Sequence, residues 1–162
     1  MLKLHKAWLG LLILALAATP ALAGPLYWDP LGSGGTGSDT LIGNPFTWSS
    51  STWSDGTNPG QAWADTSDAY FGNGGGLASP ATINLTGTVT ANTLNFGTTT
   101  TSGYIITAGS GQGLAITSGI NLGAGAQNTV IGGVDGNLGI TLAGVNTWTN
   151  NSAGGSLTVY SG

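Results

Sequence analysis

"ATINLTGTVTANTLNFG", residues 81–97, alternates apolar with polar side chains and ends in a glycine. Period-two alternation with β-branched residues predicts short β-strands, and Gly or Asn at the breaks predicts tight turns between them. The same texture continues along the chain, in GYIITAG (103–109), GLAITSGINLG (113–123), NTVIGG (128–133), LGITLAG (138–144) and SLTVYSG (156–162). None of these segments has the spacing of an amphipathic helix, so the sequence predicts an all-β fold.

The repeated runs favour a β-solenoid over a β-sandwich. An apolar residue followed by threonine recurs before turns, and LNFG (94–97) nearly matches INLG (120–123), although no strict period holds. Short strands with stackable Thr and Asn suit coils in which like side chains align from one coil to the next. A β-sandwich, with a turn every ~8 to 12 residues, is the alternative.

The first 23 residues have the pattern of a cleavable signal peptide. Lys3 and Lys6 precede an apolar run that is shorter than the ~20 residues needed to span a bilayer, and TPALA (19–23) ends in a small-residue cleavage pattern. We predict cleavage after Ala23, and therefore a protein that is secreted or displayed at the cell surface.

Residues 24–162 carry no Lys, Arg, His, Cys or Glu, because both lysines and the single histidine lie before the predicted cleavage site. Their charge comes from six aspartates: Asp29, Asp39, Asp55, Asp65, Asp68 and Asp135. A chain without basic side chains cannot neutralise phosphates, which excludes nucleic acid as a partner. An exported domain without disulfides must be stable through burial and backbone pairing alone, and repetitive β folds achieve this because each layer buries its neighbour.

The segments FTWSSSTWSDG (46–56) and WADTSDAYFG (63–72), followed by the Gly/Thr-rich runs from residue 81, resemble the start of bacterial proteins with autotransporter-associated β-strand repeats. The resemblance implies a right-handed parallel β-helix at the cell surface. Members of that family end in an outer-membrane translocator or a sorting signal, so the sequence is expected to be either the N-terminal part of a longer passenger, with the solenoid incomplete at its C-terminus, or a short exported relative. The expected division is a signal peptide (1–23), a Gly/Pro-rich lead-in (24–45), a Trp-rich capping segment (46–80) and solenoid repeats (81–162).

The sequence offers little to catalysis or metal binding. Without His, Lys or Cys, nucleophilic triads and zinc sites cannot form, and GSGGTGSD (32–39) lacks the flanking strand and helix of a nucleotide-binding loop. Asp65 and Asp68, with Asp55 nearby, are the only candidates for a hydrolase carboxylate pair, and DGTN (55–58), DTSD (65–68) or GGVDGN (132–137) for a calcium site. We favour turn-forming aspartates, and predict no catalysis, no cofactor and no metal.

Two roles are open for the tryptophans of residues 46–72. A solenoid end exposes an unpaired apolar layer, and large aromatic side chains are efficient material for a cap, which is the favoured interpretation. Alternatively, Trp48, Trp53 and Trp63, with Tyr70, form a platform on which a sugar stacks while polar neighbours bind its hydroxyls. The expected protein is thus a non-enzymatic surface or adhesin-like protein, with a surface glycan or host-cell ligand as partner. The alternative is a carbohydrate-binding domain.

Overall fold

The computed structural model describes residues 23–32, 34, 45–48, 52–72, 80–99, 102–133 and 137–160. The predicted signal peptide lies outside the described residues except for Ala23, as do Asp39 and Asp135. All regular structure in the described part is β-strand. No helix capable of crossing a bilayer occurs there.

The strands form two sheets, here called sheet A and sheet B. Sheet A contains β1 (Pro25–Trp28), β3 (Trp53–Ser54), β4 (Ser67–Phe71), β6 (Val89–Phe96), β8 (Gln112–Leu122), β10 (Leu138–Leu142) and β11 (Thr147–Asn150). Sheet B contains β2 (Phe46–Trp48), β5 (Ala81–Leu85), β7 (Tyr104–Ala108), β9 (Thr129–Ile131) and β12 (Leu157–Val159). All pairings between these strands are parallel except that of β1 with β3.

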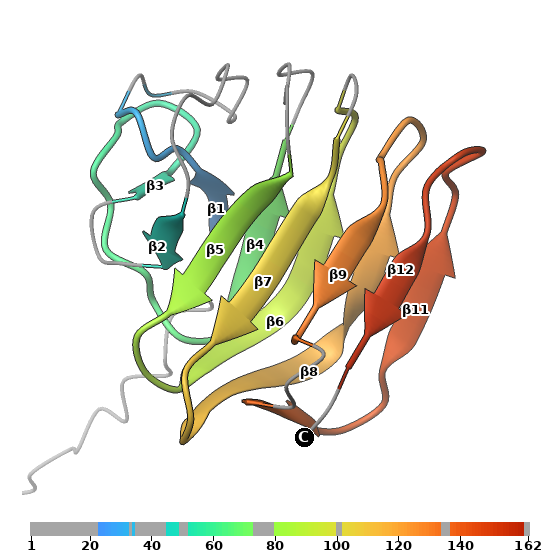
Figure 1. Cartoon of the computed structure of the whole chain (residues 1–162). Coiled ribbons are helices and arrows are strands. Elements are labelled where there is room, and N and C mark those ends of the chain that lie inside the picture. Colours follow the sequence, from blue (N-terminus) through green and yellow to red (C-terminus); the bar gives the residue numbers. More distant parts are fainter. Residues whose placement is uncertain are drawn as a thin grey trace, which may run out of the picture.

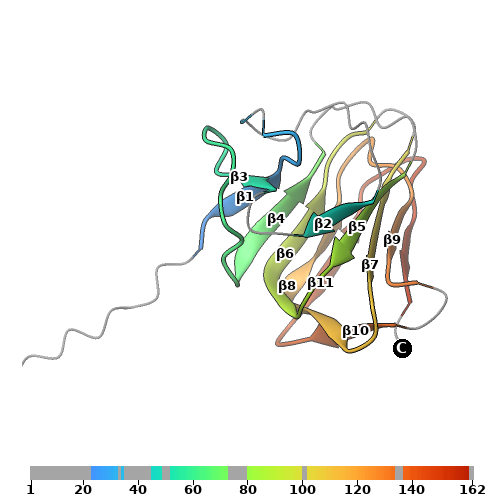
Figure 2. The same cartoon turned by 60° about the vertical axis from the view of Figure 1, so that its left-hand side comes forward.

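The chain winds as a right-handed parallel β-solenoid. From β4 to β10, successive strands alternate between the sheets, so that β4, β6 and β8 lie behind β5, β7 and β9 in Figure 1, and each coil stacks beside the previous one (Figures 1 and 2). A β-sandwich would instead pair its strands mainly in antiparallel fashion. The predicted all-β solenoid is therefore confirmed and the sandwich alternative is wrong.

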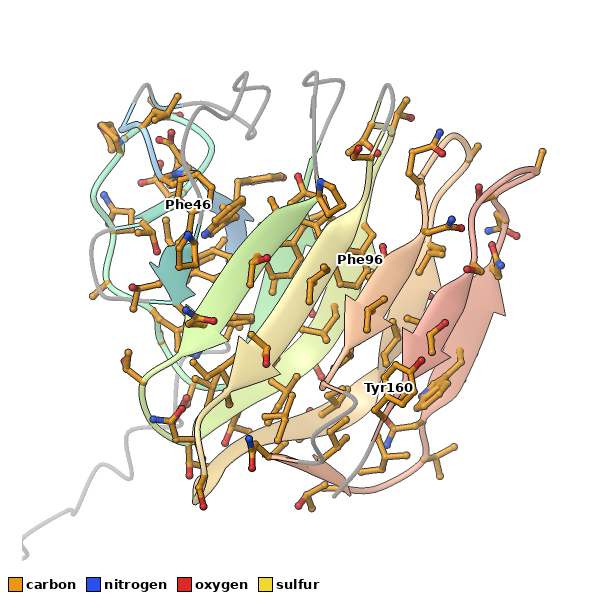
Figure 3. All side chains as sticks on the ribbon, in the orientation of Figure 1. Phe46, Phe96 and Tyr160 are labelled. Carbon is orange, nitrogen blue, oxygen red and sulfur yellow. The ribbon has the colours of Figure 1, made fainter. Side chains whose placement is uncertain are left out.

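In-register pairing aligns like side chains into columns across the coils. Ile83 of β5 pairs with Ile106 of β7, which pairs with Ile131 of β9, and all three isoleucines are buried between the sheets. The strand that carries the middle isoleucine, β7, has buried and half-buried side chains in alternation, as period-two patterning predicts. Figure 3 shows the apolar side chains filling the space between the sheets, with Phe96 among them.

Sheet A bends at a corner that widens from coil to coil. Between the paired positions on either side of this corner, the chain advances by two residues in β4 (67 to 69) and by three in β6 (91 to 94). Between the corresponding positions, it advances by four residues in β8 (116 to 120) and by six from β10 to β11 (142 to 148). From β4 onward, each coil is consequently longer than the one before. In the last described coil, sheet A contains two separate strands, β10 and β11, in place of one.

A strand of the solenoid sheet lies within the expected lead-in, before the segments in which the sequence predicts solenoid strands. β1 lies within the expected lead-in, yet it pairs with β4 and buries Trp28. β4 lies within the expected capping segment, yet it pairs with β6 as part of the solenoid sheet. Prolines at positions 25 and 30 hid the short strand β1, because proline clusters read as loop.

The coil formed by β10, β11 and β12 exposes side chains at positions that are buried in earlier coils. Leu142 and Trp148 are 49% and 44% exposed, whereas their partners in β8, Ile116 and Ile120, are fully buried. In the described chain, β10, β11 and β12 are also the outermost strands of the two sheets at this end. This end of the solenoid is therefore open.

We expect Ile106→Ala to lower the free energy of unfolding by about 2–5 kcal/mol, because it opens a cavity in the buried isoleucine column. The neighbouring Ile105→Ala makes the same chemical change on a half-buried, outward-facing side chain and should cost far less. Denaturant unfolding of both variants would measure the difference. Equal losses would contradict the register described for β7.

Candidate functional site

An aromatic plug closes the N-terminal end of the solenoid. Its members, all buried or partly buried and contributed by β1 to β4 and the loop after β3, are Trp28, Phe46, Trp48, Trp53, Trp63 and Phe71. The ring centroids of Trp48, Trp53 and Trp63 lie 4.7–4.9 Å from one another. Edge-on and tilted packing at such distances is favourable beyond the area that it buries.

Phe71 connects the plug to the coils. Its ring stacks on that of Phe96 in the next coil with a centroid distance of 5.0 Å, and it also contacts Trp48 and Trp53 at 5.5 and 5.6 Å. The short β3 pairs with β1 in antiparallel fashion and bridges to Gln61 on its other side. The plug thus covers the apolar interior while a short antiparallel strand ends sheet A, which limits unwanted strand pairing at this edge.

The structure separates the four residues of the predicted sugar platform. Trp48 is 4% exposed and Trp53 is fully buried, so neither indole presents a face to a ligand, and Trp63 packs partly buried against both. Tyr70 lies outside this cluster, because it alternates with the inward-facing Ala69 and Phe71 on β4. The tryptophans of residues 46–72 therefore have the burial of a cap.

The aspartate of the DGTN segment has a structural role in a turn. The Asp55 carboxylate accepts hydrogen bonds from the backbone N–H groups of Thr57 and Asn58 and from the Asn58 amide. Hydrogen bonds from Asn58, followed by that from Thr57, lower the pKa of Asp55. The turn places Gly56, at a φ of +94°, so that an added Cβ would lie 3.3 Å from the Tyr27 ring. A glycine is thus favoured where the turn packs on Tyr27.

Asp65 links the capping region to the next coil. Its carboxylate accepts hydrogen bonds from the Trp63 indole N–H at 3.2 Å and from the Thr90 backbone N–H at 3.1 Å. Among the described residues, no three Asp, Glu, His or Cys side chains are grouped so as to hold a metal ion. The described aspartates of the predicted carboxylate and calcium candidates are thus engaged in structural hydrogen bonds.

Asp68 ends a chain of hydrogen bonds that runs across the outer face of sheet A. The Thr149 hydroxyl donates to Asn121 Oδ1 (2.6 Å), and the Asn121 amide donates to Asn95 Oδ1 (2.9 Å). The Asn95 amide donates to Thr93 Oγ1 (2.7 Å), and the Thr93 hydroxyl donates to Asp68 Oδ1 (2.6 Å). Because every bond points in the same direction, toward a carboxylate, the bonds polarise one another and fix both amides.

A groove lies beside this chain on the outer face. It has a volume of about 320 Å³ and is lined by Tyr27, Tyr70, Gly72, Asn95, Phe96, Gly97, Asn121 and Gly123. Tyr27 pairs with Tyr70, Tyr70 with Asn95, and Asn95 with Asn121, so one outward-facing column supplies the polar lining. The three glycines of the lining directly follow the ends of β4, β6 and β8.

The two tyrosines form one end of the groove. Their ring centroids lie 5.1 Å apart, and Tyr70 is 36% exposed. Burial, and to a smaller extent the charges of Asp68 and Tyr27, raise the pKa of Tyr70, so its hydroxyl stays protonated near neutral pH and can both donate and accept hydrogen bonds. Tyr70 is the register partner of Asn95, so its ring lines the groove next to that amide.

Sequence reasoning missed this groove except for Tyr70. Tyr27 was placed in the lead-in, and no role was given to Asn95 or Asn121. The signal was present in the near match of LNFG and INLG, whose asparagines are the pair that aligns in neighbouring coils. The match shows that the two asparagines share a position, but it does not show that a tyrosine from residues 63–72 stands beside them.

Comparison of the chain with protein-family models, with curated proteins and with solved structures gives no match.

We expect acrylamide to quench mainly the fluorescence of Trp148, the most exposed of the described tryptophans, with a smaller contribution from Trp63. Trp148→Phe should remove most of the quenchable emission. Trp53→Phe is the matched control and should leave that component in place, because Trp53 is fully buried. Loss of the quenchable component in Trp53→Phe would contradict the burial of the aromatic plug.

Proposed function

We propose that the chain is an exported, non-enzymatic cell-surface protein of structural or adhesin-like type, forming the start of an autotransporter-type β-helical passenger. The observation that carries the proposal is the aromatic plug at one end of in-register coils. Three of its four tryptophans are buried there, so the segment richest in aromatic residues starts and closes a scaffold. The resemblance of roughly Trp48 to Gly162 to autotransporter-associated repeats supports the same role.

The outer surface supports a role in presenting polar side chains to other molecules, in place of catalysis. The outward columns of sheet B carry Thr47, Asn84 and Thr107 in register, and those of sheet A carry the asparagine chain. With no basic residue after residue 6, such a face is neutral to weakly acidic. It suits weak contacts spread along the solenoid, which become effective when many copies are displayed together.

Export provides the direct test. When the full chain with a C-terminal epitope tag is expressed in a Gram-negative host, mass spectrometry of the exported protein should find Gly24 at its N-terminus. When the tagged chain is fused ahead of an outer-membrane translocator, the tag should be accessible to antibody on intact cells. Leu14→Arg interrupts the apolar run and should leave an uncleaved protein inside the cell, since a charge there disfavours membrane insertion.

Leu16→Ile keeps the run apolar and is the matched variant, which should still be exported. Retention of the wild-type chain in the cytoplasm with residues 1–23 intact would overturn the proposal.

A further inference from the structure

We propose that the groove lined by Tyr27, Tyr70, Asn95 and Asn121 binds a neutral saccharide. This inference rests on the proposed surface function and names the class of ligand that the surface would recognise. It moves the expected sugar contact from the buried tryptophans to the outer face of sheet A.

The lining of the groove combines aromatic rings with side-chain amides. Sugar rings present patches of C–H groups that pack on aromatic side chains, and hydroxyls that require hydrogen-bond partners. The Tyr70 ring supplies the first kind of contact. The amides of Asn95 and Asn121, next to it in the same column, supply the second kind.

The amides retain hydrogen-bonding capacity for a ligand. Asn121 donates one of its two amide N–H groups to Asn95, and its Oδ1 accepts one bond from Thr149. Each amide oxygen has two lone pairs and each amide nitrogen two N–H groups, so Asn121 can still donate once and accept once. Asn95 Oδ1 can likewise accept a second hydrogen bond.

The hydrogen-bond chain holds these amides ready before a ligand arrives. Both asparagines are fixed by neighbours on either side, and the chain ends on the carboxylate of Asp68. Binding therefore orders few side chains, and the cost of ordering is a main reason why polar surfaces bind weakly. An ordinary exposed asparagine would lack this advantage.

The charge of the surroundings selects an uncharged ligand. The lining itself contains only tyrosine, asparagine, phenylalanine and glycine, and the nearest carboxylate in the hydrogen-bond chain is that of Asp68. Residues 24–162 contain no cation that could hold an acidic sugar. Since the column runs across strands spaced about 4.8 Å apart, a linear chain of neutral sugars lying along the solenoid axis fits best.

The test is calorimetric titration of the purified exported chain with soluble neutral polysaccharides (β-glucan, mannan, galactan and xylan), with alginate as an acidic comparison. We expect at least one neutral polymer to bind and alginate to show no binding. Tyr70→Ala should weaken binding roughly tenfold or more, because it removes the aromatic ring. Tyr70→Phe keeps the ring and should retain most of the affinity.

Tyr160→Ala is the matched control, because Tyr160 is similarly exposed at 41% but lies at the β12 end of the molecule (Figure 3). It should bind as the wild type does. Circular dichroism melting of each variant separates loss of the site from loss of the fold. The inference is wrong if no neutral polymer binds the wild type, or if a folded Tyr70→Ala binds as well as Tyr160→Ala does.

The result can be separated from that of the export test. If the wild type is exported and displayed but binds none of the polymers, the saccharide inference fails and the surface function stands. If the purified chain binds a neutral polymer but remains inside the cell, the surface function fails and the groove stands as a saccharide site.

Discussion

Parallel, in-register pairing between successive coils is the constraint on which the rest of the structure depends. Because each strand pairs with the strand one coil away, residues at equivalent positions of successive coils lie side by side, and like side chains can form columns. The same pairing therefore produces the buried isoleucine column inside and the asparagine chain outside. It also leaves an unpaired layer at each end, which is why the aromatic plug is needed where the coils begin.

The plug and the outer groove are two results of one alternation. On β4, Ala69 and Phe71 face the interior, and Tyr70 between them faces out. Phe71 joins the plug to the stacked ring of Phe96, while Tyr70 stands beside Asn95 on the other face. A strand that helps to close the solenoid on one side thus contributes to the lining of the groove on the other.

Much of the fold could be predicted from residues 81–133, where alternation is clear, but the coil length could not. From Ala69 to Leu94 the repeat is 25 residues, from Leu94 to Ile120 it is 26, and from Ile120 to Trp148 it is 28. A search for one fixed period fails because the corner of sheet A gains residues in every coil. The candidate site was harder still, since Tyr27 comes from a proline-flanked strand and meets Tyr70 only through pairing across 43 residues.

The two ends of the solenoid differ in how well its interior is covered. At the plugged end the apolar interior is covered by aromatic side chains, and sheet A stops at a short antiparallel strand. At the other end, Leu142 and Trp148 stand uncovered in line with Ile116 and Ile120, beside the edges of the outermost strands. A further strand laid there would continue both the backbone ladder and the apolar columns, so this end of the solenoid is a template for extension.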